Sequence, residues 1–76
     1  MTLQQLQYFR EICVHRNFHK AADALHVSQP SLSAAIAKLE SELGVYLFER
    51  KGRHIELTKL GKYDREQIDR ILGDLE

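Results

Sequence analysis

The sequence predicts a small, mainly α-helical domain in which three helices precede a short β-hairpin and a fourth helix follows it. Two observations support this prediction. Apolar residues recur every three or four positions through residues 3–43, as on one face of a helix, and they alternate with polar residues only at 54–57. The chain has 76 residues, of which 43% are hydrophobic, so we expect one domain with one small core.

The first helix is predicted to begin after Thr2. The Thr2 side chain can accept a hydrogen bond from a backbone amide of the first turn. The side chain of Gln5, three residues on, can accept one from the backbone amide of Thr2. The apolar pattern breaks near Arg16 and Asn17, so the helix ends there. Its apolar face consists of Leu3, Leu6, Phe9, Ile12 and Cys13.

Two further helices follow with almost no chain between them. A short helix is predicted over about residues 19–25 and a longer one over 29–43, and His26 and Val27 form a tight turn between them. Ser28 caps the longer helix, and Gly44 ends it because glycine adopts the left-handed conformation readily. Small and apolar residues are expected to pack the two helices together, namely Ala22, Leu25, Val27, Leu32 and Ile36.

The spacing of apolar residues changes after Gly44. The turn at residues 51–53 and the alternation at 54–57 predict a β-hairpin, and Thr58 caps a last helix that runs towards the C-terminus. Two helices joined by a tight turn and followed by a hairpin constitute a winged helix-turn-helix.

Short hydrogen-bonding residues crowd the start of the third helix. In a helix-turn-helix this end enters the DNA major groove, where Gln29 can pair with adenine and Pro30 can lie against a thymine methyl group. The same residues also make an ordinary, well-capped helix start, but the short preceding helix and the basic hairpin favour DNA contact. The predicted DNA-binding residues are Ser28, Gln29, Pro30, Ser31, Ser33, Lys38, Arg50, Lys51 and Arg53.

The net charge is zero, which by itself argues against a nucleic-acid partner. Residues 28–62 carry six basic and four acidic groups, for +2, whereas residues 63–76 carry two basic and five acidic groups, for −3. A modest basic centre is therefore offset by an acidic tail. The alternative function is a protein-interaction module, which differs from DNA binding in lacking a steep dependence on salt.

Three segments of the chain, "LQQLQYFREIC", "FHKAADALHVSQPSLSAAIAKLESELGVYLFER" and "IELTKLGK", resemble the N-terminal winged helix-turn-helix of the LysR-type bacterial transcriptional regulators. The resemblance implies a cytoplasmic bacterial protein that binds double-stranded DNA sequence-specifically, as a dimer or tetramer on A·T-rich interrupted inverted repeats. It also implies a C-terminal effector-binding domain that is absent here. We therefore expect no cofactor in this fragment and a small-molecule effector on the missing domain.

On this resemblance, residues 1–57 are the DNA-binding domain and residues 58–76 the start of a linker and dimerisation helix. Arg50 and Arg53 match the wing arginines of the family, which contact phosphate or enter the minor groove. The chain departs from the family at three places. His19 stands at the usual cap of the second helix, alanine occupies positions 34, 35 and 37 where many members have Arg, Lys or Gln, and residues 64–65 replace an apolar pair.

The last helix carries a heptad-like seam, which is typical of a helix that pairs with another helix. Asp64 lies in the seam and Arg65 beside it, so we expect a weak dimer or a monomer in dilute solution. The alternative is that the helix packs only on its own domain, through Leu60 and Tyr63. The predicted dimerisation residues are Leu60, Ile68, Ile71, Leu72 and Leu75.

Other classes of protein find little support. No apolar run approaches the roughly 18 residues of a membrane span, and the amphipathic pattern starts too early for a signal peptide. Cys13 is expected to be a small core residue and suits a reducing compartment. His15 and His19 lie four apart, but the helix breaks between them and no third ligand completes a metal site. No catalytic set is visible, so we do not expect an enzyme.

Overall fold

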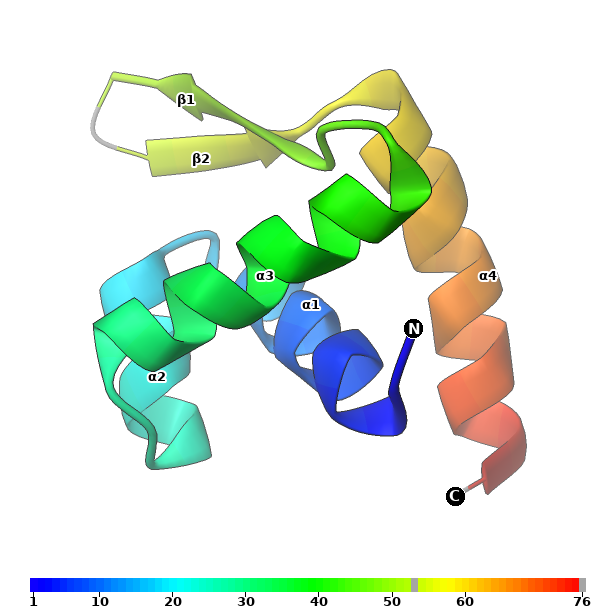
Figure 1. Ribbon diagram of the computed structural model, residues 1–76, viewed down its shortest axis with the longest axis horizontal. Helices are drawn as coiled ribbons and strands as arrows, with labels where there is room; N and C mark the ends of the chain where they lie inside the picture. The colour runs from blue at the N-terminus through cyan, green and yellow to red at the C-terminus, as the bar shows by residue number, and fades with distance from the viewer. Residues whose placement is uncertain (53, 76) are drawn as a thin grey trace.

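The computed structural model describes residues 1–52 and 54–75, and the side chains of this range except those of residues 74 and 75. It confirms the predicted winged helix-turn-helix. Figure 1 shows the hairpin running above α3 and α4 standing beside the core. Among the described residues, no helix is both long and apolar enough to cross a membrane. The elements are α1 (Leu3–His15), α2 (Phe18–Leu25), α3 (Gln29–Leu43), β1 (Phe48–Lys51), β2 (His54–Leu57) and α4 (Lys59–Leu75).

The start of α1 is the predicted capping box. Thr2 Oγ1 accepts from the Gln5 amide at 3.1 Å, and Gln5 Oε1 accepts from the Thr2 amide at 2.9 Å. The helix ends at Arg16, whose left-handed backbone (φ 56°) turns the chain towards α2.

The start of α2 corrects one prediction. Asn17 is the cap, and its Oδ1 accepts from the Lys20 amide at 2.8 Å. His19 lies inside the first turn of the helix and its Nε2 is 3.5 Å from Asp23 Oδ2. The prediction that His19 occupies the cap position was wrong by two residues. Because asparagine is among the best N-cap residues, α2 has a firm start.

We expect Asn17→Ala to lower the free energy of unfolding by about 1 kcal/mol, because it removes the acceptor for a first-turn amide. His19→Ala is the matched control and should change stability by less than about 0.5 kcal/mol, because this exposed side chain only pairs with Asp23 on the surface. Urea titrations of the two variants measure both values. Equal losses would show that Asn17 does not cap the helix.

The joint between α2 and α3 has the predicted tight turn. His26 adopts a left-handed backbone (φ 59°), and the Val27 amide donates to the Ala22 carbonyl at 3.0 Å. Ala21 and Ala22 are 0% and 2% exposed, so the helices approach closely here. Ser28 then caps α3, as predicted.

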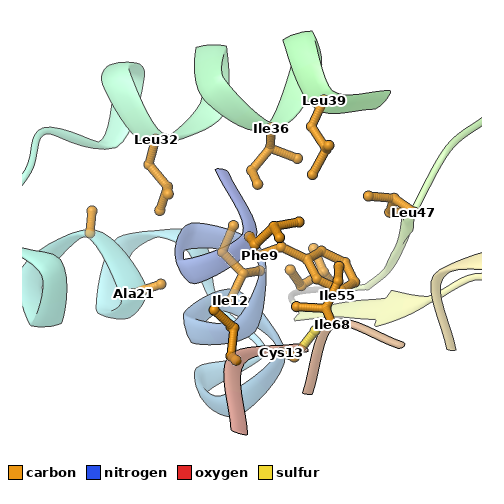
Figure 2. Close-up of a cluster of buried hydrophobic side chains, with 13 residues drawn as sticks. Phe9, Ile12, Cys13, Ala21, Leu32, Ile36, Leu39, Leu47, Ile55 and Ile68 are labelled. Atoms are coloured by element: carbon orange, nitrogen blue, oxygen red, sulfur yellow. The ribbon is translucent and has the colours of Figure 1, made fainter. Parts of the chain in front are cut away.

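The core lies between α3 and the other helices. Figure 2 shows Leu32, Ile36 and Leu39 pointing from α3 towards Phe9 and Ile12 of α1. Cys13 belongs to the same cluster, which confirms its predicted place. Burial raises the pKa of its thiol to about 12, so the thiol stays protonated and weakly nucleophilic at neutral pH.

The packing of α4 corrects the predicted dimerisation surface. Ile68 and Leu72 are only 4% and 2% exposed and form part of the core, so they are not available to a partner helix. Leu60 and Tyr63 are 53% and 61% exposed, so the alternative packing through these two residues was also wrong. The side chain of Leu75 lies outside the described range. The core thus extends past the boundary predicted at residue 57.

Candidate nucleic-acid interface

The exposed side of α3 is fixed by its buried side. One side of α3 is buried in the core through Leu32, Ile36 and Leu39, so the opposite side of the helix faces solvent. We call this exposed set the α3 outer face. It comprises Gln29, Pro30, Ser31, Ser33, Ala34, Ala37, Lys38, Ser41 and Glu42.

The two serines at the start of α3 bond to each other. Ser28 Oγ accepts from the Ser31 amide at 3.1 Å and donates to Ser31 Oγ at 2.8 Å. Pro30 has no amide hydrogen, and the Leu32 amide donates to the Ser28 carbonyl at 3.0 Å. In the described part of the chain, the structure shows no acceptor for the Gln29 amide or for the Ser31 hydroxyl hydrogen. Ser28 itself is engaged as the cap.

The α3 outer face and the hairpin are separated by a groove of about 230 Å³. From α3 it is lined by Gln29, Ser33 and Ala37, which follow one another along the helix at intervals of four residues. Glu49 and Arg50 line it from the hairpin. The structure thus brings the predicted reading residues of α3 and one predicted wing residue to a common groove.

The register of the hairpin separates its two described basic residues. Arg50 lies opposite Ile55, which is buried, so Arg50 shares the face that turns towards the core and α3. Lys51 lies opposite His54 on the other face, and its Nζ is 3.9 Å from Glu49 Oε1. The third predicted wing residue, Arg53, lies outside the described residues.

Two interactions hold the hairpin against the helices. Glu40 Oε2 accepts from the Leu47 amide at 2.7 Å, which ties the end of α3 to the chain that enters β1. Phe48, the first residue of β1, places its ring 5.2 Å from that of Phe9 and 6.0 Å from that of Phe18. Sequence reasoning missed the role of Glu40. The only signal for it was a carboxylate on the third helix, four residues before Gly44.

The charges around this surface are few. Lys38, Arg50 and Lys51 are exposed cations. The N-terminal ammonium donates to Glu42 Oε2 at 2.9 Å, and this hydrogen bond holds the pKa of Glu42 below its usual range. The acidic residue on the exposed side of α3 is therefore paired with a cation of the same chain.

No metal centre emerges in the described part of the chain, where no three His, Cys, Asp or Glu side chains converge. His15 Nε2 lies 3.3 Å from Glu11 Oε1 on the same helix. His15 and His19 thus each face a carboxylate on their own helix.

Known proteins resemble this chain in both sequence and fold. The profile of the bacterial regulatory helix-turn-helix proteins of the lysR family matches residues 3–62. The hydrogen peroxide-inducible genes activator of Pectobacterium carotovorum subsp. carotovorum is 44% identical over 75 residues, which cover 99% of this chain and 25% of that protein. The chain therefore spans about a quarter of the length of the curated relatives that it matches first.

Two similar structures were solved in complex with DNA. The CbnR_DBD–DNA complex has a TM-score of 0.91 and 44% identity over 96% of this chain and 84% of that chain. The complex of BenM_DBD with benA site 1 DNA has a TM-score of 0.94 and 37% identity over 99% of this chain and 87% of that chain.

Proposed function

Because the chain belongs to the lysR family of bacterial regulatory helix-turn-helix proteins, we propose that it is the DNA-binding part of a transcriptional regulator and binds double-stranded DNA sequence-specifically. The observation that carries this proposal is the groove that the α3 outer face shares with the hairpin, in a fold whose close structural neighbours are bound to DNA. Residues 1–57 hold the contact surface, and residues 58–76 begin a linker helix.

In this proposal α3 enters the major groove. Gln29 and Ser33 are exposed and present hydrogen-bonding groups to base edges. The Gln29 amide and the Ser31 hydroxyl hold a backbone phosphate at the helix start, and Pro30 lies against a base. Ser28 contributes as the N-cap of α3. Lys38, Arg50, Lys51 and Arg53 contact the DNA backbone, or, for the wing, the minor groove.

We propose that this chain is part of a longer protein, because it spans about a quarter of the length of its relatives. We propose that the remainder includes an effector-binding domain for a small molecule, and that the protein is cytoplasmic, regulatory and not an enzyme. Its DNA site is then an A·T-rich interrupted inverted repeat bound by a dimer.

Replacing Arg50 with alanine tests DNA binding directly. We expect Arg50→Ala to bind all duplexes more weakly. The slope of log Kd against log salt concentration should fall by about one unit, because one phosphate contact is lost. Arg70→Ala removes the same charge from the exposed side of α4 and should leave the slope unchanged. Binding is measured by fluorescence anisotropy. If Arg50→Ala changes neither the affinity nor the slope, the hairpin does not contact the DNA. If the wild-type chain binds no duplex at any salt concentration, the protein-interaction module is favoured instead.

Self-association is proposed through the exposed side of α4. Leu60, Tyr63 and Ile71 are each about half exposed or more. Leu60 and Ile71 lie beside the buried stripe of the helix, and Tyr63 lies opposite it. Asp64 stands one turn after Leu60, in the middle of this surface. Arg65 lies on the other side, where it lines a groove with Cys13 and its Nε is 3.6 Å from Asp69 Oδ2.

We therefore expect Asp64→Leu to strengthen self-association roughly tenfold or more, because it removes a charge that must be desolvated when two α4 helices meet. Arg65→Leu is the matched control and should have little effect. Sedimentation equilibrium at micromolar concentration measures both. A tight wild-type dimer that Asp64→Leu leaves unchanged would place the interface elsewhere.

A further inference from the structure

We infer that this chain reads thymine methyl groups with Ala34 and Ala37. The inference rests on the proposed function, since it assumes that the α3 outer face lies in the major groove, and it specifies which chemical feature of the DNA that face recognises.

The argument starts from the position of these alanines on α3. Successive residues turn by about 100° around a helix, which puts Ala34 on the side directly opposite the buried stripe of Leu32, Ile36 and Leu39. Pro30 lies one turn before Ala34 and Ala37 lies about one turn after it, and all three are exposed. The row of side chains that projects furthest from the domain therefore begins with three short apolar residues, and Ser41 follows one turn after Ala37.

Polar side chains flank this apolar row on both sides. Gln29 and Ser33 lie towards the hairpin, where they line the groove with Arg50. Lys38 lies on the opposite side of the helix. Hydrogen bonding to base edges and attraction to phosphates are thus assigned to the flanks. In the central row, the three residues nearest the start of α3, Pro30, Ala34 and Ala37, have neither a charge nor a hydrogen-bonding side chain.

In the major groove, these apolar side chains can contact only one base-specific apolar group. Every base edge there offers donors or acceptors, and thymine alone among the four bases adds an exposed methyl group. Alanine cannot bond to the polar edges, but its Cβ packs well on a methyl group. The short side chain also allows the helix backbone to come close to the bases. The half-site should therefore contain thymine at the one or two positions that face Ala34 and Ala37.

Exposed alanine is also an ordinary surface residue of helices, because alanine has the highest helix propensity. Ala24 on α2 is such a residue, exposed and away from the groove. The two explanations differ in what they predict for DNA. A merely helix-forming alanine is indifferent to a methyl group on a base, whereas a reading alanine loses its partner when that methyl group is removed.

The test first selects binding duplexes from a randomised pool with this chain. Each thymine of the enriched half-site is then replaced by uracil, one at a time, which removes the methyl group and leaves the hydrogen-bonding edge unchanged. We expect one or two positions at which affinity falls roughly three- to fivefold, as for the loss of one buried methyl group, and little change elsewhere.

The protein side of the test uses Ala34→Gly and Ala37→Gly, with Ala24→Gly as the matched control for helix propensity. Circular dichroism checks that each variant is folded. The uracil effect should disappear at one position in each of the two test variants and persist in Ala24→Gly. The substitution of the bases needs no protein variant, so the inference stays testable if a glycine variant fails to fold.

The outcomes are distinguishable. If no duplex is enriched, the proposed function fails and this inference fails with it. If duplexes are enriched but uracil is tolerated at every thymine, sequence-specific binding stands and methyl readout is overturned. If every uracil effect persists in both Ala34→Gly and Ala37→Gly, another residue, such as Pro30, reads the methyl groups and the assignment to the alanines is overturned.

Discussion

Replacing Phe9 with alanine is expected to lower the free energy of unfolding by about 3–5 kcal/mol, because it removes a large side chain from the centre of the core. Phe9, which lies within the buried cluster of Figure 2, is 0% exposed. Its ring packs on that of Phe48, the residue that begins the hairpin. A domain of this size is typically stable by only about 4–11 kcal/mol, so much of its stability would be lost.

The matched control for this variant is Val14→Ala, on the same helix. Val14 is 60% exposed, so its truncation should change stability by less than about 0.5 kcal/mol. Urea denaturation followed by circular dichroism measures both variants. A Phe9→Ala variant that loses less than about 1 kcal/mol would contradict the described core.

Gly61→Ala is expected to destabilise the domain by about 1–3 kcal/mol, although alanine is the better helix former. A Cβ at this position would overlap the carbonyl oxygen of Leu47 and would lie 3.1 Å from Leu57 Cδ2. The same carbonyl accepts from the Thr58 amide at 3.0 Å, so it is held in place. The first turn of α4 must therefore shift away from the chain that leads into the hairpin.

Gly73 provides the control on the same helix, because nothing lies within 4 Å of an added Cβ there. Gly73→Ala should stabilise the domain by up to about 1 kcal/mol through helix propensity alone. Thermal denaturation compares the two variants. Stabilisation by both substitutions would show that α4 does not approach Leu47 as described.

The sequence predicted the elements well because their boundaries depend on local chemistry. The capping box of Thr2 and Gln5, the Ser28 cap and Gly44 at the end of α3 each act within one helical turn. A side chain and the backbone group that it bonds are then close in sequence, so the pattern of residue types is sufficient to locate them. The family resemblance added the function and the candidate DNA-binding residues.

The errors on α4 arose because sequence spacing does not say which side of a helix meets another element. On α4 two neighbouring apolar stripes were available, and the spacing alone did not show that Ile68 and Leu72 face the core while Leu60 and Ile71 face solvent. For α2 the error was of another kind, since the family pattern put a cap at His19 although Asn17 has the better capping chemistry.

Parts of the interface also depend on contacts between elements far apart in sequence. The hydrogen bond from the Leu47 amide to Glu40 and the packing of Phe48 on Phe9 and Phe18 fix where the hairpin lies relative to α3. The register of the hairpin then decides that Arg50, and not Lys51, faces the groove. None of these relations has a signature in residue spacing.

The central claim is that the α3 outer face and the hairpin form the DNA-contacting surface. The most direct test is to titrate the isotope-labelled chain with a selected duplex that holds a single half-site and to follow the backbone amide resonances by NMR. The account predicts that the largest shift changes fall on residues 28–38 and 49–51, and that a scrambled duplex at the same salt concentration produces much smaller ones. Changes concentrated on the exposed side of α4, with the amides of residues 28–38 unmoved, would contradict it.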